Sequence, residues 1–135
     1  MALAADTDIL ADAPAEMKSS GYADLFAKLP AGAEWIMTDI MGIEPIRKDV
    51  WELIQPPLRS WLANADDLQA VFEGLAATGY AMQLYKDSRP ASGMEHLCSH
   101  VWEMEGVNAS HGFKVGLGTL ASIFQLSTES FFKAG

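Results

Sequence analysis

Apolar residues recur at helical spacing along most of the chain, and no stretch alternates apolar and polar positions long enough to predict a sheet. The clearest helix begins at Asp66 or Asp67, which are good N-caps, and runs to about Tyr85. One stripe of this segment is apolar, with Leu68, Val71, Phe72, Leu75 and Met82. The pattern therefore predicts an all-α, multi-helix domain.

Proline and glycine set the expected ends of the other helices. A short helix is expected after Asp12, with Pro14 in its first turn and Gly21 at its end. A second is expected over residues 22–41, kinked or interrupted at Pro30. The remaining expected elements are a helix through 50–54 that Pro56 and Pro57 bend or restart, a loop at 86–91, a helix over 94–105 capped by Ser92, a loop at 106–110, and a helix from His111 toward Phe131.

The composition narrows the class of protein. A chain of 135 residues, half of them apolar and a fifth charged, has the size and composition of one globular domain. A net charge of −9 without a basic cluster argues against nucleic-acid binding. The single cysteine, Cys98, fits a reducing compartment, and the longest uncharged run, 115–128, is too short to span a bilayer. The first residues carry no basic region typical of a signal peptide, so we expect a cytoplasmic protein that binds neither nucleic acid nor membrane.

The three histidines form the first candidate site. His96 and His100 are four residues apart on one expected helix, so they share a face, and His111 opens the next helix after a short loop. Two neighbouring helices would bring imidazoles to one point, as a metal site requires. Spacing alone leaves open the alternative that these are ordinary polar or capping residues. Glu95 precedes His96 instead of following it, so the zinc-protease motif His-Glu-x-x-His is absent.

Two weaker signals favour structural interpretations. Residues 116–121 read Gly-Leu-Gly-Thr-Leu-Ala, a loose match to a dinucleotide-binding loop, but no strand is expected before them. Small residues that let two helices approach closely are the favoured explanation. Cys98 is expected to be a small buried side chain, not a nucleophile. The four tryptophans and seven methionines are expected mostly in the core.

Two motifs carry a family resemblance. Residues 88–96 read Ser-Arg-Pro-Ala-Ser-Gly-Met-Glu-His, and residues 111–116 read His-Gly-Phe-Lys-Val-Gly. Together they resemble sn-glycerol-1-phosphate dehydrogenases, within the iron-containing alcohol dehydrogenase and dehydroquinate synthase-like superfamily. Residues 5–17 and 21–28 resemble the same family, so the resemblance covers almost the whole chain.

The resemblance implies a metal site and its ligands. In the family, one Asp and two His hold a divalent ion, usually zinc, with nickel or iron in some members. Those positions fall on Asp24, His96 and His111 of this sequence. Ala23 stands where the family commonly has the second glycine of its Gly-x-Gly-Asp turn, a mild change that should not remove the ligand.

The resemblance also implies an activity: an NAD- or NADP-dependent oxidoreductase that interconverts dihydroxyacetone phosphate and sn-glycerol 1-phosphate. His100 is then expected beside the metal, outside its ligand set, as a substrate contact or proton relay. Lys28 and Arg89 are the cations considered for the phosphate of this small-molecule substrate, although no motif assigns them. A homo-oligomer is compatible with this interpretation.

The family's enzymes begin with an α/β nucleotide-binding domain and continue with helices beyond the matched region. We therefore expect this chain to correspond to part of the C-terminal helical domain, without the cofactor-binding residues. Two alternatives stay open: a related polyol dehydrogenase of the superfamily, and a non-catalytic helical module that binds metal or a partner. The 135 residues alone are expected to bind a divalent metal weakly and to show no turnover.

Overall fold

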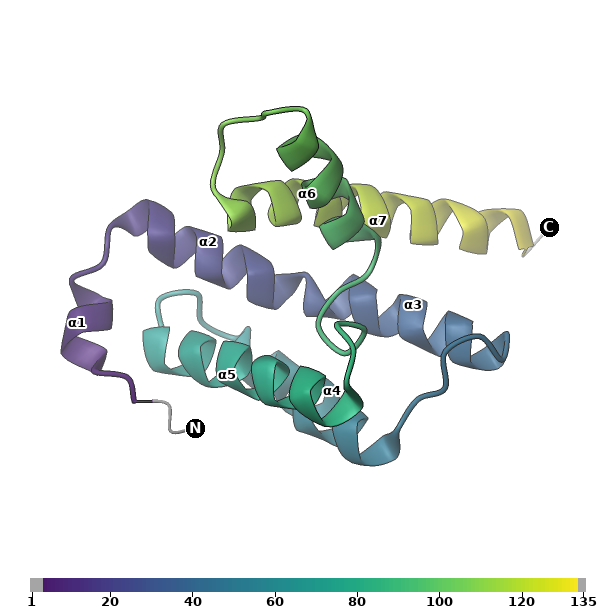
Figure 1. Cartoon of the computed structure of the whole chain (residues 1–135), viewed down its shortest axis with the longest axis horizontal. Helices are drawn as coiled ribbons and strands as arrows, with labels where there is room; N and C mark the ends of the chain where they lie inside the picture. Colours follow the sequence, from purple (N-terminus) through teal and green to yellow (C-terminus); the bar gives the residue numbers. More distant parts are fainter. Residues whose placement is uncertain (1–3, 134–135) are drawn as a thin grey trace.

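The computed structural model describes residues 4–133, and within that range it contains helices and no strand (Figure 1). The predicted all-α class is confirmed. The helices are α1 (Thr7–Ala11), α2 (Ala15–Phe26), α3 (Lys28–Ile40), α4 (Lys48–Trp61), α5 (Leu68–Tyr85), α6 (Met94–Met104) and α7 (His111–Lys133). None of these helices is long and apolar enough to cross a membrane.

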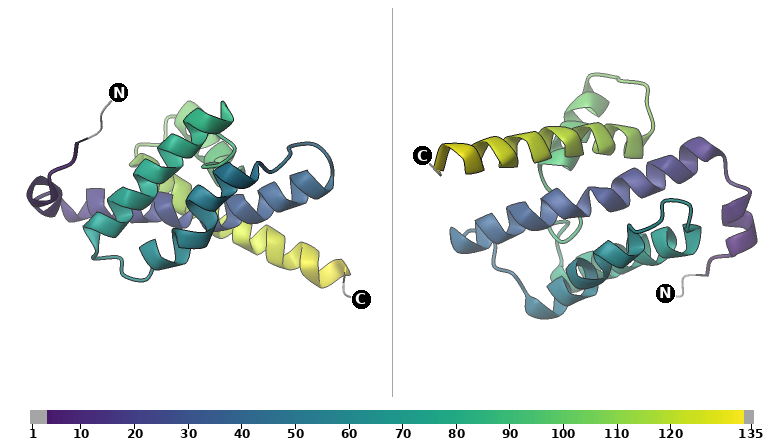
Figure 2. Two further views of the ribbon diagram at one scale, coloured as in Figure 1. Left: turned by 90° about the horizontal axis from the view of Figure 1, so that it is seen from below. Right: turned by 180° about the vertical axis from the view of Figure 1, so that it is seen from behind.

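The helices form three layers. Helices α2 and α3 follow each other almost in line and make the central layer (Figure 1). The pair α4 and α5 packs on one side of it, and the pair α6 and α7 on the other, as the view from behind also shows (Figure 2). The short helix α1 lies at the start of α2 and contacts α5.

Pro30 explains why the central layer is two helices. A proline at this position has no N–H to donate to the carbonyl of Phe26, and its ring crowds that carbonyl. Helix α2 accordingly ends at Phe26, and α3 begins at Lys28, with Ala27 between them. The expected interruption is confirmed. Because Asp24 and Lys28 are four residues apart across this junction, their side chains still face each other.

The apolar core lies on the α4–α5 side of the central layer. One cluster joins α3 to α4 and α5 through buried Trp35, Val50, Ile54 and Ala81. A second joins α2 to the same pair through Leu25, Leu58 and Val71. Burial of these side chains is the main source of stability for the fold, at roughly 1.5–3 kcal/mol for each large apolar side chain.

The interface between α7 and its neighbours is built from small residues. A Cβ at Gly118 would lie 2.5 Å from the carbonyl oxygen of Glu95 in α6, and a Cβ at Gly116 would lie 3.2 Å from the Cβ of Ala23 in α2. These two glycines therefore let the backbones approach closely. They lie inside α7 and follow a helix, so the structural interpretation of residues 116–121 is confirmed.

Most expected helices are present, including α5 with Asp67 as its N-cap and α7 beginning at His111. The expected end at Gly21 is wrong, the restart given as one possible effect of Pro56 and Pro57 does not occur, and α1 was not expected. Gly21 lies inside α2, where Val71 and Leu75 of α5 pack against it, and this packing outweighs the helix penalty of about 1 kcal/mol. Helix α4 continues through Pro56 and Pro57 without restarting, because the core buries the residues around them.

The cap of α6 also differs from expectation. Ser92 does not cap the helix, because its hydroxyl donates to the carbonyl of Ser88. Two carboxylates take that place: Glu95 accepts the Gly93 N–H at 2.7 Å, and Glu34 of α3 accepts the Met94 N–H at 2.9 Å. The start of α6 is thus fixed by acidic side chains, which the positive end of a helix favours.

The expected burial of the large side chains is confirmed only in part. Trp35 is buried, and the other three tryptophans are half-buried. None of the methionines that the structure describes is buried, and Met17, Met37, Met41 and Met104 are exposed. Cys98 is half-buried.

Candidate metal centre

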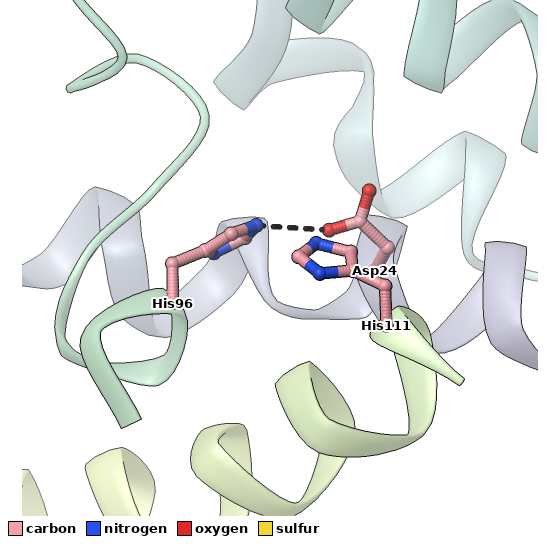
Figure 3. A group of neighbouring side chains, drawn as sticks. All are labelled: Asp24, His96 and His111. Carbon is pink, nitrogen blue, oxygen red and sulfur yellow. Dashed lines mark ion pairs between the residues drawn. The ribbon is translucent and has the colours of Figure 1, made fainter. Parts of the chain in front are cut away.

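Asp24, His96 and His111 come from three helices and meet at one point (Figure 3). One ligand atom from each lies within 4.8 Å of the others, and the two imidazole rings are 5.5 Å apart between centroids. Asp24 lies in the last turn of α2, while the turn between α6 and α7 folds His111 back toward His96. The expected convergence of these residues is present, although 72 positions separate the first two.

Asp24 lies beside two potential cations. Its Oδ1 accepts a hydrogen bond from Lys28 Nζ at 2.9 Å and lies 3.3 Å from His96 Nε2. Burial by itself would raise the pKa of this carboxyl, but the contacts with His96 and Lys28 hold it well below its usual value. Asp24 is therefore ionised at neutral pH, as a metal ligand must be.

His96 is oriented by a carboxylate on its other nitrogen. Nδ1 lies 2.9 Å from Glu95 Oε1, and Glu95 is fully buried. A carboxylate at Nδ1 selects the tautomer with its proton on Nδ1, so the lone pair is on Nε2, the nitrogen that faces Asp24. Burial lowers the pKa of His96, but the contacts with Asp24 and Glu95 raise it above its ordinary value overall.

His111 has the same arrangement at a more exposed position. Its Nδ1 lies 3.3 Å from Glu103 Oε1, and Lys114 Nζ is 3.2 Å from the same oxygen. Contacts with His111 and Lys114 lower the pKa of Glu103 to about 2. His100 contacts this carboxylate too, through Nδ1 at 3.5 Å, and is 61% exposed. His100 therefore lies next to the group and outside it, on the side open to solvent.

The donor set fits a divalent transition metal. Two imidazoles and one carboxylate are ligands for zinc, nickel and iron, and three protein ligands leave a position for substrate, as in catalytic sites. Ligand atoms around tetrahedral zinc lie about 3.4 Å apart, and the observed separations, all within 4.8 Å, are of similar size. The carboxylates on both Nδ1 atoms are the supporting contacts that metal-binding histidines normally have.

The two cations considered for the phosphate lie in different surroundings. Lys28 is only 2% exposed. Its ammonium group lies beside the candidate metal ligands, because it donates a hydrogen bond to Asp24. Arg89 is held between acidic and polar groups, with Nε 2.8 Å from Glu44 Oε2 and Nη2 donating to Thr38 at 3.3 Å. The recorded contacts of Arg89 tie the loop before α6 to α3. Its role in phosphate binding stays a prediction.

Glu95 and Glu103 are the residues that sequence reasoning missed. The signal was present in part, because Glu95 adjoins His96 and Glu103 lies seven residues, or two helical turns, after it on the same helix. Acidic residues are common at such positions without any role, so only the structure connects Glu95 to His96, and Glu103 to His111 and His100.

Fold and site together define an all-helical domain that brings two histidines and a carboxylate together as candidate metal ligands. No family model matches the chain. It is 33% identical over 133 residues to a glycerol-1-phosphate dehydrogenase (NAD(P)+) of Halalkalibacterium halodurans. It is 35% identical over 132 residues to one of Geobacillus thermodenitrificans, and 32% over 129 residues to one of Halobacterium salinarum.

These alignments cover most of this chain and a minor part of each relative. They take in 89%, 88% and 89% of the chain, but 33%, 33% and 37% of the relatives. The chain therefore spans about a third of the length of the curated relatives it matches. The resemblance to glycerol-1-phosphate dehydrogenases is confirmed over that third.

Proposed function

We propose that this chain forms the metal-holding part of an NAD- or NADP-dependent glycerol-1-phosphate dehydrogenase, with dihydroxyacetone phosphate and sn-glycerol 1-phosphate as its substrates. The observation that carries the proposal is the meeting of Asp24, His96 and His111, which the motifs predicted as ligands. The names of the relatives favour this substrate over that of a related polyol dehydrogenase. Zinc is the proposed metal, with nickel or iron as alternatives of the same donor chemistry.

A bound divalent ion supplies Lewis acidity, which polarises the substrate carbonyl and stabilises negative charge on its oxygen. The chain's own residues orient the metal ligands and provide charge for the substrate. Glu95 and Glu103 fix the two imidazoles, and the Lys28 ammonium adds a positive charge beside Asp24 that suits a phosphorylated substrate. His100, exposed and in contact with Glu103, is placed to exchange a proton with solvent.

Zinc binding by single variants tests the proposed ligands. In competition with a chromophoric chelator, we expect the wild-type chain to bind zinc, and Asp24→Asn, His96→Ala and His111→Ala each to weaken binding more than about 100-fold. His100→Ala is the matched control, because it removes a neighbouring imidazole outside the group and should leave the zinc affinity within about threefold of wild type. Equal losses in all four variants would show that no particular set of ligands exists.

Activity needs a separate measurement. Hydride transfer requires the nicotinamide within about 3–3.5 Å of the substrate carbon. Because the chain matches only a third of the relatives' length, we expect no oxidation of NADH or NADPH by the 135 residues with zinc and dihydroxyacetone phosphate. Steady turnover that His96→Ala abolishes would instead place the cofactor site within these residues.

A further inference from the structure

Glu95 buries a carboxylate in the first turn of α6, and among the described residues only one of its two oxygens has partners. Its side chain is fully buried, and Oε2 has no hydrogen-bond partner among the described residues. Oε1 accepts the Gly93 N–H at 2.7 Å and contacts His96 Nδ1 at 2.9 Å. Within the described part of the chain, His96 is the one recorded ion-pair partner of Glu95. A buried carboxylate in this state costs stability.

The nearest acidic neighbour adds to this cost. A Cβ built on Gly93 would lie 2.5 Å from Glu34 Oε2 and 2.9 Å from Glu95 Oε2, so the two carboxylates face the same small space. Glu34 is in turn 3.9 Å from Arg89, whose closer contact is Glu44. A neutral residue of similar shape at position 95 would avoid both the desolvation and the repulsion.

We propose that Glu95 is a positioning residue for the metal centre: its carboxylate holds His96 with Nε2 toward the ligand group, and the cation bound there offsets the charge that Glu95 buries. This inference rests on the proposed metal site. It explains why a carboxylate, whose burial costs stability, occupies a position where a neutral amide could supply the same hydrogen-bond acceptor. It also gives a reason for the buried, unpartnered Oε2, which the cap formed by Oε1 does not by itself require.

The decisive variant is Glu95→Gln, because it keeps the acceptor for the Gly93 N–H and removes the negative charge. We expect its zinc dissociation constant to rise about tenfold, measured by chelator competition. In excess chelator, and at a pH above the raised pKa of His96 so that no protonated ring is paired with Glu95, we expect the thermal midpoint of the same variant to be equal to or above that of wild type. Glu95→Leu removes the acceptor as well, and its zinc affinity should fall about 100-fold.

The matched control is Glu105→Gln, the same charge change at an exposed residue just after the same helix. It should alter neither zinc affinity nor the midpoint. Cobalt(II) adds a spectroscopic readout, because a misplaced imidazole changes the visible absorption of the bound ion in Glu95→Leu.

Each other outcome is informative. Unchanged zinc affinity in Glu95→Gln would overturn the inference while leaving the ligand set intact. A lower midpoint of that variant in chelator would show that Glu95 serves the metal-free fold, and would overturn it too. Failure of the folded wild-type chain to bind zinc or cobalt would refute the metal site itself, a result that precedes any comparison of variants.

Discussion

At the scale of single residues, His96 is the group on which proton and metal compete. Its Nε2 lies 3.3 Å from Asp24 and its Nδ1 2.9 Å from Glu95, so a protonated ring is stabilised from both sides. Although burial lowers the pKa of His96, these two contacts raise it overall above the ordinary value. A metal needs the same Nε2 with its lone pair free, so binding must release this proton.

The competition predicts opposite pH dependences for the two forms of the chain. Because the folded pKa of His96 is raised, its contribution to stability is fully present below the unfolded value of about 6.5 and is lost as the pH rises through the raised pKa. In chelator, we therefore expect the thermal midpoint to fall as pH increases across this window. With zinc, the midpoint should rise over the same window, since affinity increases as the ring loses its proton.

His96→Gln is the control for this prediction. It removes the titrating group, and both slopes should flatten relative to wild type. Parallel slopes with and without zinc in the wild-type chain would contradict the assignment of His96 as the site of competition.

The candidate ligands could be predicted from the sequence, whereas their supporting residues could not. The motifs around His96 and His111 are distinctive, and together they directed attention to Asp24. Spacing alone predicted a shared face for His96 and His100, and it left a metal site with His111 as one of two alternatives. Glu95 and Glu103 depend on side-chain directions at helix ends, which tertiary packing sets and a linear pattern does not encode.

At the scale of helices, periodicity predicted which segments are helical, and packing decided several of their ends. Pro30 breaks the central layer as expected because its effect on the preceding carbonyl is local. Gly21, Pro56 and Pro57 do not end their helices, because the residues beside them contribute to a buried interface. The cap of α6 comes partly from Glu34, sixty positions before the residue it binds, so no local motif predicts it.

Helix α7 supplies a prediction at this scale, since Gly118 sets its distance from α6. A Cβ on Gly118 would lie 2.5 Å from the Glu95 carbonyl oxygen and 2.9 Å from its Cα, both backbone atoms that cannot turn aside. We expect Gly118→Ala to lower the free energy of unfolding by about 1–3 kcal/mol in urea denaturation. Zinc affinity should fall as well, because the shift displaces the turn that carries Glu95 and His96.

Gly79→Ala in α5 is the matched control, because a Cβ there meets nothing within 4 Å. The same substitution should raise the free energy of unfolding by about 0.5–1 kcal/mol through helix propensity. If Gly118→Ala stabilised the chain as Gly79→Ala does, that result would contradict the close packing of α7 against α6 at Gly118.

At the scale of the whole molecule, the two sides of the central layer bury different kinds of side chain. The α4–α5 side buries large apolar side chains, while the α6–α7 side buries Glu95, Ser99, Lys114, Thr119 and Ser122. Polar groups in that number contribute less to stability than apolar burial does. The candidate site therefore lies on the more polar α6–α7 side, while the apolar α4–α5 side contributes more to the stability of the fold.

The outer faces of α6 and α7 lead to the last prediction, which concerns self-association. Exposed apolar side chains follow one stripe of α7, at Phe113, Leu117, Leu120 and Phe124, and another of α6, at Leu97, Val101 and Met104. Exposed apolar stripes of this kind favour association, while the net charge of −9 opposes it.

We therefore expect the chain to associate with rising concentration, and more strongly at high salt, where screening weakens the repulsion. Sedimentation equilibrium at low and high salt measures both effects. The double variant Leu120→Glu with Phe124→Glu should remain monomeric, because it places charges at two of the four residues of the α7 stripe. Ile9→Glu, at an exposed apolar residue on α1 far from this stripe, is the control and should associate as wild type does.

A wild-type chain that stays monomeric at every concentration and salt would show that these faces do not drive association. Association that weakens with salt would point instead to charge pairing between copies.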